Sequence, residues 1–328
     1  MKTLLLHQFT FDRIKDRLAP FADRVHPITM DTAGIFHDPA TGEAIDQPQP
    51  DIAFGSNDVW TNAKMRRYLE VLQQTPHLQW FQSSAAGTEF PALAALGRRA
   101  DAYCTCHVQA EPMAEWAIWV ALDFLRAGPA HRSQQAAKVW QRMQSREIEG
   151  SRWLIIGFGS IGAAVGQRVQ ALGGHVTGVR RSGGSSPDAD AISNTTTPEL
   201  LGASDVVLLC APHTSETEGM ANAAFFAAMK PDALFLNLGR GALVREDDLV
   251  AALDAGRPAF AGLDVVVKEP LPAESPLWLH PKVMITPHNS GSTRGTITRA
   301  DDLFLDNLDR FLTGKPLRHL ADKSIFKE

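Results

Sequence analysis

The sequence predicts an α/β protein with two domains, each built on a parallel β-sheet. The chain has 328 residues, and a usual domain has about 100 to 200. Short apolar runs alternate with helix-like stretches, a pattern typical of parallel sheets covered by helices on both faces. One apolar run leads directly into a glycine-rich loop, G-x-G-x-x-G, at the start of a helix. We therefore expect two Rossmann-like or flavodoxin-like domains, with the active site in the cleft between them.

The first part of the chain, up to about residue 102, carries the signals of one such domain. Apolar runs of strand length lie at residues 3–6, 51–54 and 78–81. Helical periodicity covers residues 11–21 and 64–73. The polar, Gly- and Pro-containing stretch at residues 32–50 indicates a loop or hairpin inside this domain, not a linker between domains.

The second domain is predicted to begin at an apolar helix, residues 112–125, with Pro112 in the first turn, where proline is tolerated. Strands are then expected at residues 153–156, 175–179, 206–209, 234–237, 260–264 and 283–285. The long amphipathic helix at 293–312 is expected to return to the first domain. The predicted domains are therefore residues 1–103 with 293–328, and residues 104–292.

The charge balance indicates a small-molecule partner. Thirty-two basic and 37 acidic residues give a net charge of -5, and no long basic run favours nucleic acid or an anionic membrane. The apolar run Leu4 to Leu6 is too short for a secretion signal or a membrane span. Three cysteines, Cys104, Cys106 and Cys210, suit a reducing cytoplasm, and no second Cys/His cluster completes a metal site with them.

The glycine-rich loop predicts a dinucleotide site. Gly157, Gly159 and Gly162 follow an apolar strand and open a helix. In such loops the first glycine permits the tight turn, the second allows close approach of a pyrophosphate, and the third allows close helix packing. The amides of Ser160 and Ile161, at the helix N-terminus, are expected to face the phosphates. The alternative is a strand-to-helix turn without a ligand.

The end of the next strand favours NADPH over NADH. An NAD-binding protein usually has Asp or Glu there to accept the ribose hydroxyls, whereas this chain has Arg180, Arg181 and Ser182. A guanidinium suits the additional 2′-phosphate of NADP. The alternative is that both arginines are only solvated charges at the end of the strand.

Three separated segments provide the groups that reduce a ketone. Arg240, Glu269 and His288 each follow a predicted strand of the second domain, and loops beyond the carboxyl ends of such strands border the ligand crevice. Reduction requires a cation to hold a carboxylate and polarise the carbonyl, and an acid to protonate the oxygen. Each residue alone has an ordinary alternative, as a surface cation, a loop charge or a turn residue.

These segments together resemble the D-isomer-specific 2-hydroxyacid dehydrogenase family. The resemblance is weak up to about residue 82 and strong from 153 to 291, including Pro212, Thr214 and the Met229-Lys230-Pro231 segment. Within the family the resemblance is closest to glyoxylate/hydroxypyruvate reductases. Residues 179–182 resemble the strand end that these reductases use for NADP. It implies that Arg240 binds the substrate carboxylate and carbonyl, and that His288 paired with Glu269 is the acid/base.

The resemblance also implies the remaining contacts. Asp264, Pro212 and Met113 are expected near the cofactor, Met113 on a loose match only. The run from Ser83 to Thr88 resembles the family loop whose amides bind the substrate carboxylate, so Ala86 and Gly87 are expected substrate contacts; an ordinary small-residue turn is the alternative. The large aromatics Trp60 and Trp278 are more often core than pocket. A homodimer is expected.

The sequence thus predicts a D-2-hydroxyacid dehydrogenase that reduces a small 2-oxo acid of the glyoxylate or hydroxypyruvate kind with NADPH. The first domain is then the substrate domain and the second the dinucleotide-binding domain. Because one fold hosts unrelated functions, a nucleotide-sensing or corepressor-like binding protein without turnover is the second hypothesis. The intact Arg240, Glu269 and His288 set favours the enzyme.

Overall fold

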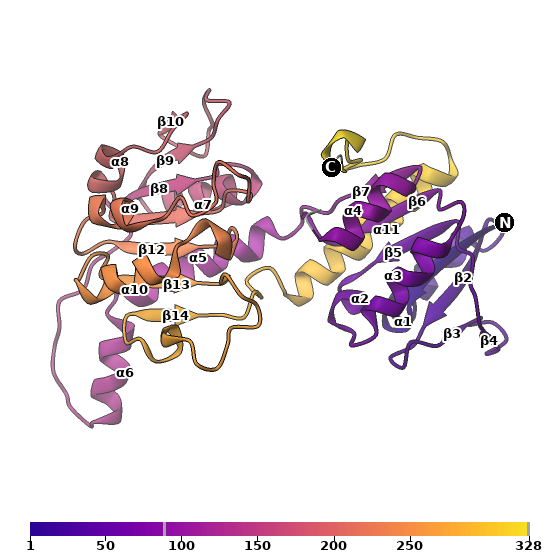
Figure 1. Cartoon of the computed structure of the whole chain (residues 1–328), viewed down its shortest axis with the longest axis horizontal. Helices are drawn as coiled ribbons and strands as arrows, with labels where there is room; N and C mark the ends of the chain where they lie inside the picture. Colours follow the sequence, from indigo (N-terminus) through magenta and orange to yellow (C-terminus); the bar gives the residue numbers. More distant parts are fainter. Residues whose placement is uncertain (88–89, 327–328) are drawn as a thin grey trace. The chain divides into compact units, whose positions relative to one another are not determined.

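The structure is a computed structural model that describes residues 1–87 and 90–326. The chain divides into two compact units (Figure 1). One consists of residues 1–108 and 293–328, and the other of residues 109–292. Each unit has its own seven-stranded sheet, and each is described by itself below.

The sheet of the second unit is parallel throughout its paired strands, in the order β10-β9-β8-β11-β12-β13-β14. The order runs outward in both directions from β8 and β11, so the crevice at their carboxyl ends is the topological switch point of a Rossmann fold. The strands are β8 (Arg152–Ile156), β9 (His175–Val179), β10 (Ala191–Ser193), β11 (Val206–Leu209), β12 (Leu234–Asn237), β13 (Phe260–Leu263) and β14 (Val283–Ile285).

Helices cover both faces of this sheet, because successive strand residues point to opposite sides. Leu154 and Ile156 pack into one core cluster, and Trp153 and Ile155 pack into the other. The second cluster includes the long helix α5, which contacts α7. The helices are α5 (Ala110–Leu125), α6 (Gly128–Ala136), α7 (Ser160–Ala171), α8 (Pro198–Ala203), α9 (Ala223–Ala228) and α10 (Glu246–Asp254), with short turns η2 (Gly241–Leu243) and η3 (Pro276–Leu279).

The sheet of the first unit has five parallel strands, in the flavodoxin-like order β2-β1-β5-β6-β7. Two short strands, β3 and β4, extend it as an antiparallel hairpin. The predicted loop or hairpin at residues 32–50 is therefore confirmed as a hairpin. The strands are β1 (Lys2–His7), β2 (Val25–Met30), β3 (Phe36–His37), β4 (Ala44–Ile45), β5 (Ile52–Gly55), β6 (Trp80–Ser83) and β7 (Ala102–Cys104).

Helix α11 completes the first unit, although it is the last helix in the chain. Thr293 caps it by accepting the Thr296 amide. Its Phe304 stacks on Phe54 and Trp80 in the core. The helices are α1 (Gln8–Leu18), α2 (Asn57–Thr61), α3 (Met65–Gln74), α4 (Pro91–Arg99) and α11 (Arg294–Leu312), with short turns η1 (Ala19–Phe21) and η4 (Lys323–Phe326).

The predicted α/β class with two parallel-dominated sheets is confirmed, while several short elements were not predicted. Strand β2 contains Pro27, and proline argues against an interior strand because it has no amide to donate. Yet β2 pairs with β1 through all six of its residues. The other helices and strands that were not predicted are α2, α4, α6, β7 and β10. The strands predicted for the second unit all form, within one or two residues at each end.

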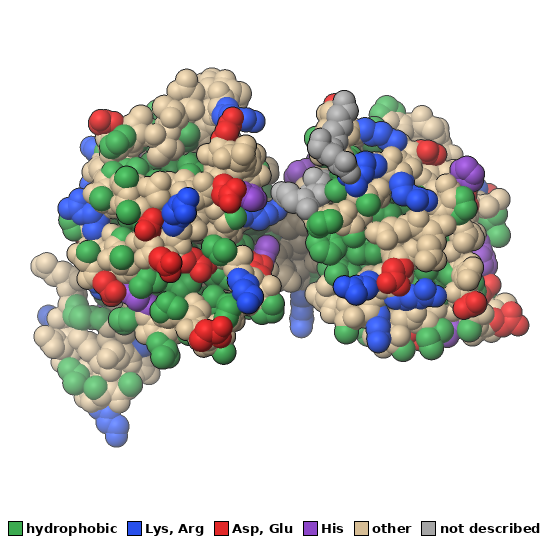
Figure 2. All heavy atoms as spheres, viewed as in Figure 1, with side chains coloured by type: hydrophobic (Ala, Val, Ile, Leu, Met, Phe, Trp, Pro, Cys, Tyr) green, Lys and Arg blue, Asp and Glu red, His purple; other side chains and the backbone are tan. Residues whose placement is uncertain are grey.

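The described residues contain no helix that is both long and apolar enough to cross a membrane. They also contain no group of three or more His, Cys, Asp or Glu side chains arranged to hold a metal ion. Figure 2 shows acidic and basic side chains interspersed over the visible face of each unit. No broad field of one sign therefore covers that face, as the charge balance indicated.

Candidate active site

The predicted catalytic residues follow three neighbouring strands of the second unit. In the sheet register Asn237 at the end of β12 pairs with Leu263 of β13, and Leu263 pairs with Ile285 of β14. Arg240 and His288 lie three residues beyond their strand ends, and Asp264 directly follows β13. Since parallel strands end at one edge, these loops emerge side by side.

The loop that carries Arg240 is held by hydrogen bonds to its own backbone and by close packing at Gly241. The buried Asn237 side chain accepts the Gly239 amide at 3.0 Å and donates to the Arg240 carbonyl at 3.0 Å. Arg240 Nη1 donates to the Gly239 carbonyl at 2.8 Å. A Cβ built on Gly241 would lie 2.0 Å from the Val266 carbonyl carbon, so only glycine allows this approach. The Arg240 loop is thereby packed against the segment that leads to Glu269.

Glu269 and His288 contact each other directly. The distance from Glu269 Oε2 to His288 Nδ1 is 2.7 Å, and both side chains are partly exposed. Because Nδ1 faces the carboxylate, Nε2 is the ring nitrogen that can present a proton to a substrate. His288 has φ +50°, the left-handed region that costs a residue other than glycine about 1 to 2 kcal/mol. The loop that holds it must supply that energy.

Asp264 is the main hydrogen-bond acceptor of this loop. Its carboxylate is almost fully buried and accepts hydrogen bonds from the Thr286 hydroxyl at 2.6 Å, the Asn289 amide at 3.0 Å and the amide and hydroxyl of Ser290. Its carbonyl also accepts the His288 amide at 2.8 Å. The Asp264 side chain therefore organises the histidine loop, a role that the sequence did not indicate.

The glycine-rich loop has the geometry of a dinucleotide cradle. Gly157 has φ +95°, and a Cβ there would lie 2.3 Å from the Ala211 nitrogen after β11. Nothing described lies within 4 Å of where a Cβ of Gly159 would be, so the backbone faces open space. Helix α7 begins at Ser160, and its first amides have no acceptor within the helix. An anionic pyrophosphate fits this arrangement.

The thiol of the half-buried Cys210 contacts the same loop. Cys210 Sγ contacts the Gly157 carbonyl at 3.2 Å. Burial raises the pKa of Cys210 to about 12, so the thiol stays protonated near neutral pH. We therefore assign Cys210 a packing role. Pro212 follows it on the surface, where its carbonyl accepts the Thr217 hydroxyl at 2.8 Å.

The two arginines at the end of β9 differ in their surroundings. Arg180 donates to the Gly183 carbonyl at 2.7 Å and to the Ser185 carbonyl at 2.9 Å, so its guanidinium closes its own loop. The Arg181 side chain is 84% exposed and lies 3.2 Å from Glu216 Oε2. Ser182 is exposed beside it. Arg181 is thus the freer cation for an anionic ligand.

The expected substrate loop lies at the carboxyl end of β6 in the first unit. The Ser84 amide donates to the Gly55 carbonyl, and Trp60 Nε1 donates to the Ser84 hydroxyl at 2.8 Å. The Ala85 amide donates to Ser83 Oγ at 3.0 Å. Within the described part of the chain no acceptor is bonded to the amides of Ala86 and Gly87. Thr88, the last residue of the predicted loop, lies outside the described residues.

The two remaining candidates have different surroundings. Met113 packs in the first turn of α5 against Gly291, where a Cβ would lie 3.6 Å from Met113 Cγ. Trp278 is half-exposed and donates to the Pro272 carbonyl at 2.9 Å.

Thr286 and Ser290 were not selected from the sequence, although both lie in the same motif as His288. Their hydroxyl groups next to that histidine were the available signal.

Comparison with known proteins identifies the family. The chain matches the sequence model of the D-isomer specific 2-hydroxyacid dehydrogenase NAD binding domain over residues 118–290, just over half of its length. It belongs to the D-isomer specific 2-hydroxyacid dehydrogenase family. The matched range includes Arg240, Glu269 and His288 and the glycine-rich loop. The family resemblance seen in the sequence is confirmed.

Two curated relatives of this family member are reductases. Hydroxypyruvate reductase of Blautia hydrogenotrophica is 39% identical over 171 residues, which are 52% of this chain and 53% of that protein. Glyoxylate/hydroxypyruvate reductase A of Klebsiella pneumoniae is 32% identical over 212 residues, 64% of this chain and 67% of that protein. The match therefore spans about half the length of the first relative and two thirds of the second.

Solved structures of the family share the fold along nearly the whole chain. A D-isomer specific 2-hydroxyacid dehydrogenase family protein from Aeromonas salmonicida has a TM-score of 0.80 at 28% identity, over 98% of both chains. NADPH-dependent glyoxylate/hydroxypyruvate reductase from Sinorhizobium meliloti, solved with NADP and sulfate, has a TM-score of 0.78 at 26% identity, over 99% of both chains. The predicted two-domain α/β fold is confirmed by this likeness.

Proposed function

We propose that the protein is an NADPH-dependent reductase of small 2-oxo acids. The observation that carries the proposal is the direct contact of Glu269 with His288 Nδ1, in loops next to the Arg240 loop at the carboxyl edge of an NAD-binding-type sheet. This arrangement presents an imidazole proton beside a fixed guanidinium loop. Both are what a ketone needs while it is reduced.

The proton is delivered by His288. The Glu269 carboxylate fixes the imidazole ring, because Oε2 lies 2.7 Å from Nδ1. Nε2 then donates its proton to the carbonyl oxygen of the substrate. The nicotinamide cofactor, when bound, supplies the hydride that reduces the carbonyl carbon. In the oxidative direction the same nitrogen accepts the proton of the alcohol.

Arg240 binds the oxo acid in this proposal. Its planar fork can hold the carboxylate and polarise the carbonyl at the same time, which a lysine ammonium cannot do. We also propose residues 1–103 with 293–328 as the substrate domain and 104–292 as the dinucleotide-binding domain. The amides of Ala86 and Gly87, which have no acceptor within the described part of the chain, support the first assignment, and the glycine-rich loop supports the second. The curated names of the two relatives support glyoxylate or hydroxypyruvate as the substrate class.

The cofactor we propose is NADPH, not NADH. The open space above Gly159 and the amides of Ser160 and Ile161 fit the pyrophosphate. Arg181 and Ser182 would hold the 2′-phosphate, while Arg180 keeps their loop in shape. The Sinorhizobium meliloti protein, an NADPH-dependent reductase solved with NADP, supports this choice.

The test is loss of reduced-nicotinamide absorbance when the purified protein is mixed with NADPH and glyoxylate or hydroxypyruvate. Turnover by the wild type, and loss of most of kcat in His288→Ala with NADPH binding retained, support the enzyme. NADPH binding without turnover on a panel of 2-oxo acids favours the other hypothesis, a nucleotide-sensing binding protein. Failure of NADPH to bind rejects both.

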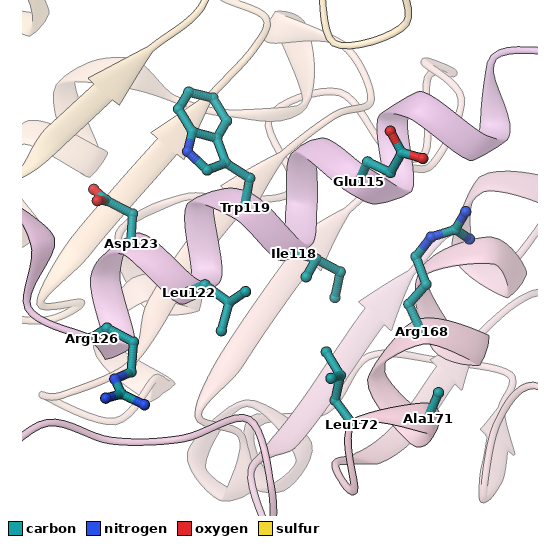
Figure 3. A pocket seen from close by; sticks show the side chains of 9 residues that line it. All are labelled: Glu115, Ile118, Trp119, Leu122, Asp123, Arg126, Arg168, Ala171 and Leu172. Carbon is teal, nitrogen blue, oxygen red and sulfur yellow. The ribbon is translucent and has the colours of Figure 1, made fainter. Parts of the chain in front are cut away.

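We also propose a homodimer formed through the outer face of α5. A groove of about 800 Å³ lies between α5 and α7, and Figure 3 shows Ile118 and Leu122 of α5 on the side of Leu172, with Trp119 projecting from the other side of the helix. The Trp119 side chain is 51% exposed. Beyond α6, residues 137–147 form an exposed segment without helix or strand, on which Trp140 is 98% exposed.

The exposed segment of a second copy could contact this groove through Trp140, Lys138 and Arg142. The groove is lined by apolar side chains and by charges of both signs, Glu115 and Asp123 with Arg126 and Arg168. In an isologous interface each copy can contribute both surfaces. Sedimentation should give twice the chain mass of 35.7 kDa, and Trp140→Glu should give the single chain. A wild type that sediments as a single chain rejects the dimer.

The free thiols of Cys104, Cys106 and Cys210 support a cytoplasmic location.

A further inference from the structure

We propose that Thr286 is a positioning residue for the acid/base histidine, acting through Asp264. This inference rests on the proposed function. The Thr286 hydroxyl donates to Asp264 Oδ1 at 2.6 Å and accepts the indole N–H of Trp116 at 2.9 Å. Thr286 therefore connects a buried tryptophan of α5 to the carboxylate that holds the histidine loop.

The direction of these hydrogen bonds is determined by the groups themselves. An indole N–H can only donate, and an ionised carboxylate can only accept. A hydroxyl has one proton to donate and lone pairs that accept, so it is the group that can join the two. A valine at this position has the same shape as threonine and can do neither. The shape and the hydrogen bonding of Thr286 can therefore be separated by mutation.

Helix α5 supports the same loop at two further points. A Cβ on Gly291 would lie 3.2 Å from Gln109 Cβ and 3.6 Å from Met113 Cγ. Gln109, Met113 and Trp116 recur at helical spacing and so lie on one face of α5. This face contacts the histidine loop at both ends, through Gly291 and through Thr286. The loop is thus packed on a rigid helix, and Thr286 is the hydrogen-bonded point of that contact.

Loss of the Thr286 hydroxyl should release the loop. Asp264 Oδ1 would lose one donor, and the buried Trp116 N–H would lose its acceptor, which is unfavourable away from water. The same carboxylate holds the amides of Asn289 and Ser290, on the C-terminal side of His288. A shift of the carboxylate therefore moves the imidazole relative to Glu269, and proton transfer is sensitive to such displacements.

The second unit contains a matched control. Trp153 Nε1 donates to Ser151 Oγ at 3.0 Å, and Ser151 donates to the Ile148 carbonyl at 2.6 Å. An indole, a hydroxyl and an oxygen acceptor are linked here in the same order as at Thr286. Ser151 and Trp153 are both buried, but Ser151 precedes β8 at the amino edge of the sheet. Ser151→Ala should lower stability, as Thr286→Val does, without acting on the histidine loop.

The experiment compares full-length Thr286→Val, Thr286→Ser and Ser151→Ala with wild type. We expect Thr286→Val to lose about 10- to 100-fold in kcat for the oxo acid, with the affinity for NADPH nearly unchanged. Its KM for the oxo acid should stay nearly unchanged, because the Arg240 loop is not altered. Thr286→Ser, which keeps the hydroxyl, should restore kcat. Ser151→Ala should change only the melting temperature.

Amide hydrogen exchange of the peptide containing residues 286–291 gives a reading independent of turnover. Exchange should be faster in Thr286→Val than in wild type, Thr286→Ser or Ser151→Ala. If the wild type reduces no 2-oxo acid, the proposed function fails and exchange alone decides the positioning role. Wild-type exchange in folded Thr286→Val overturns the inference. So does an unchanged kcat in an active protein, or a Thr286→Ser variant as impaired as Thr286→Val.

Discussion

The two carboxylate oxygens of Glu269 contact different groups, one the His288 side chain and the other the backbone of Val266. Oε2 lies 2.7 Å from Nδ1 of His288, while Oε1 accepts the amide of Val266 at 3.2 Å. The backbone contact restrains the carboxylate, so the ring meets an oxygen that is already in place. Val266 is also the residue against which Gly241 packs, which joins the Arg240 loop to the same structure.

Glu269→Gln should lower kcat for reduction of the oxo acid. The carboxylate can only accept from His288 Nδ1, which leaves Nε2 to face the substrate. A glutamine amide can also present its NH2 group to Nδ1 and so favour the wrong tautomer of the ring. We expect a loss of at least about 10-fold in kcat, with a nearly unchanged Kd for NADPH. Wild-type kcat in folded Glu269→Gln would falsify the pairing.

Arg240→Lys should impair use of the oxo acid without impairing cofactor binding. The lysine ammonium cannot contact the carboxylate and the carbonyl together, so we expect a loss of about 100-fold in kcat/KM. The glycine-rich loop is on other strands, and titration of NADPH by fluorescence should give a nearly unchanged Kd. A folded Arg240→Lys protein with wild-type kcat/KM removes this residue from the site.

The two arginines after β9 should respond differently to substitution. Arg181→Gln should lower kcat/KM for NADPH by about 10- to 100-fold, the value of a charge-assisted contact, with little change for NADH. Arg180→Gln should weaken both cofactors, because its guanidinium closes the loop on the Gly183 and Ser185 carbonyls. Steady-state kinetics with both cofactors checks this. Equal use of NADH and NADPH by the wild type contradicts the phosphate-binding role of Arg181.

The stability of the protein should fall with acidification partly because of His7. Burial lowers the pKa of His7 from its usual value, and Nδ1 caps α1 by accepting the Phe9 amide at 3.2 Å, which a protonated nitrogen cannot do. The unfolded chain therefore binds a proton near pH 6.5 that the folded chain does not. The contribution of His7 is present above about pH 7 and is lost as pH falls towards 5.

His7→Asn provides the comparison, since asparagine is a good N-cap that does not titrate in this range. Its melting temperature should depend less on pH than that of wild type between about pH 7 and 5. Parallel curves for wild type and His7→Asn would show that the histidine contributes nothing to the acid sensitivity.

The sequence was sufficient for the parts of the site that depend on topology. Arg240, Glu269 and His288 could be expected in one place because each follows a strand of a parallel sheet, and β12, β13 and β14 are indeed neighbours. What it could not indicate was how the loops are held. The left-handed φ of His288 and the five hydrogen bonds to the Asp264 carboxylate are tertiary contacts with no local pattern.

Local rules alone do not determine the surroundings of two further residues. Pro27 argues against strand β2, yet the parallel pairing of β1 with β2 accommodates it opposite Leu4. Arg180 has the position expected for a phosphate ligand, and its side chain bonds to the carbonyls of its own loop. In both cases the neighbours decide the outcome, and a single sequence does not show which neighbours a residue will have.

The contact of Gly241 with Val266 limits which residues can occupy the Arg240 loop. Even the methyl group of alanine at position 241 would lie 2.0 Å from the Val266 backbone, so a side chain there would force the Arg240 loop away from the segment that leads to Glu269. A library designed to change the substrate range should therefore keep Gly241 unchanged. The exposed Ala86 carries no such restriction and is a position that such a library can vary.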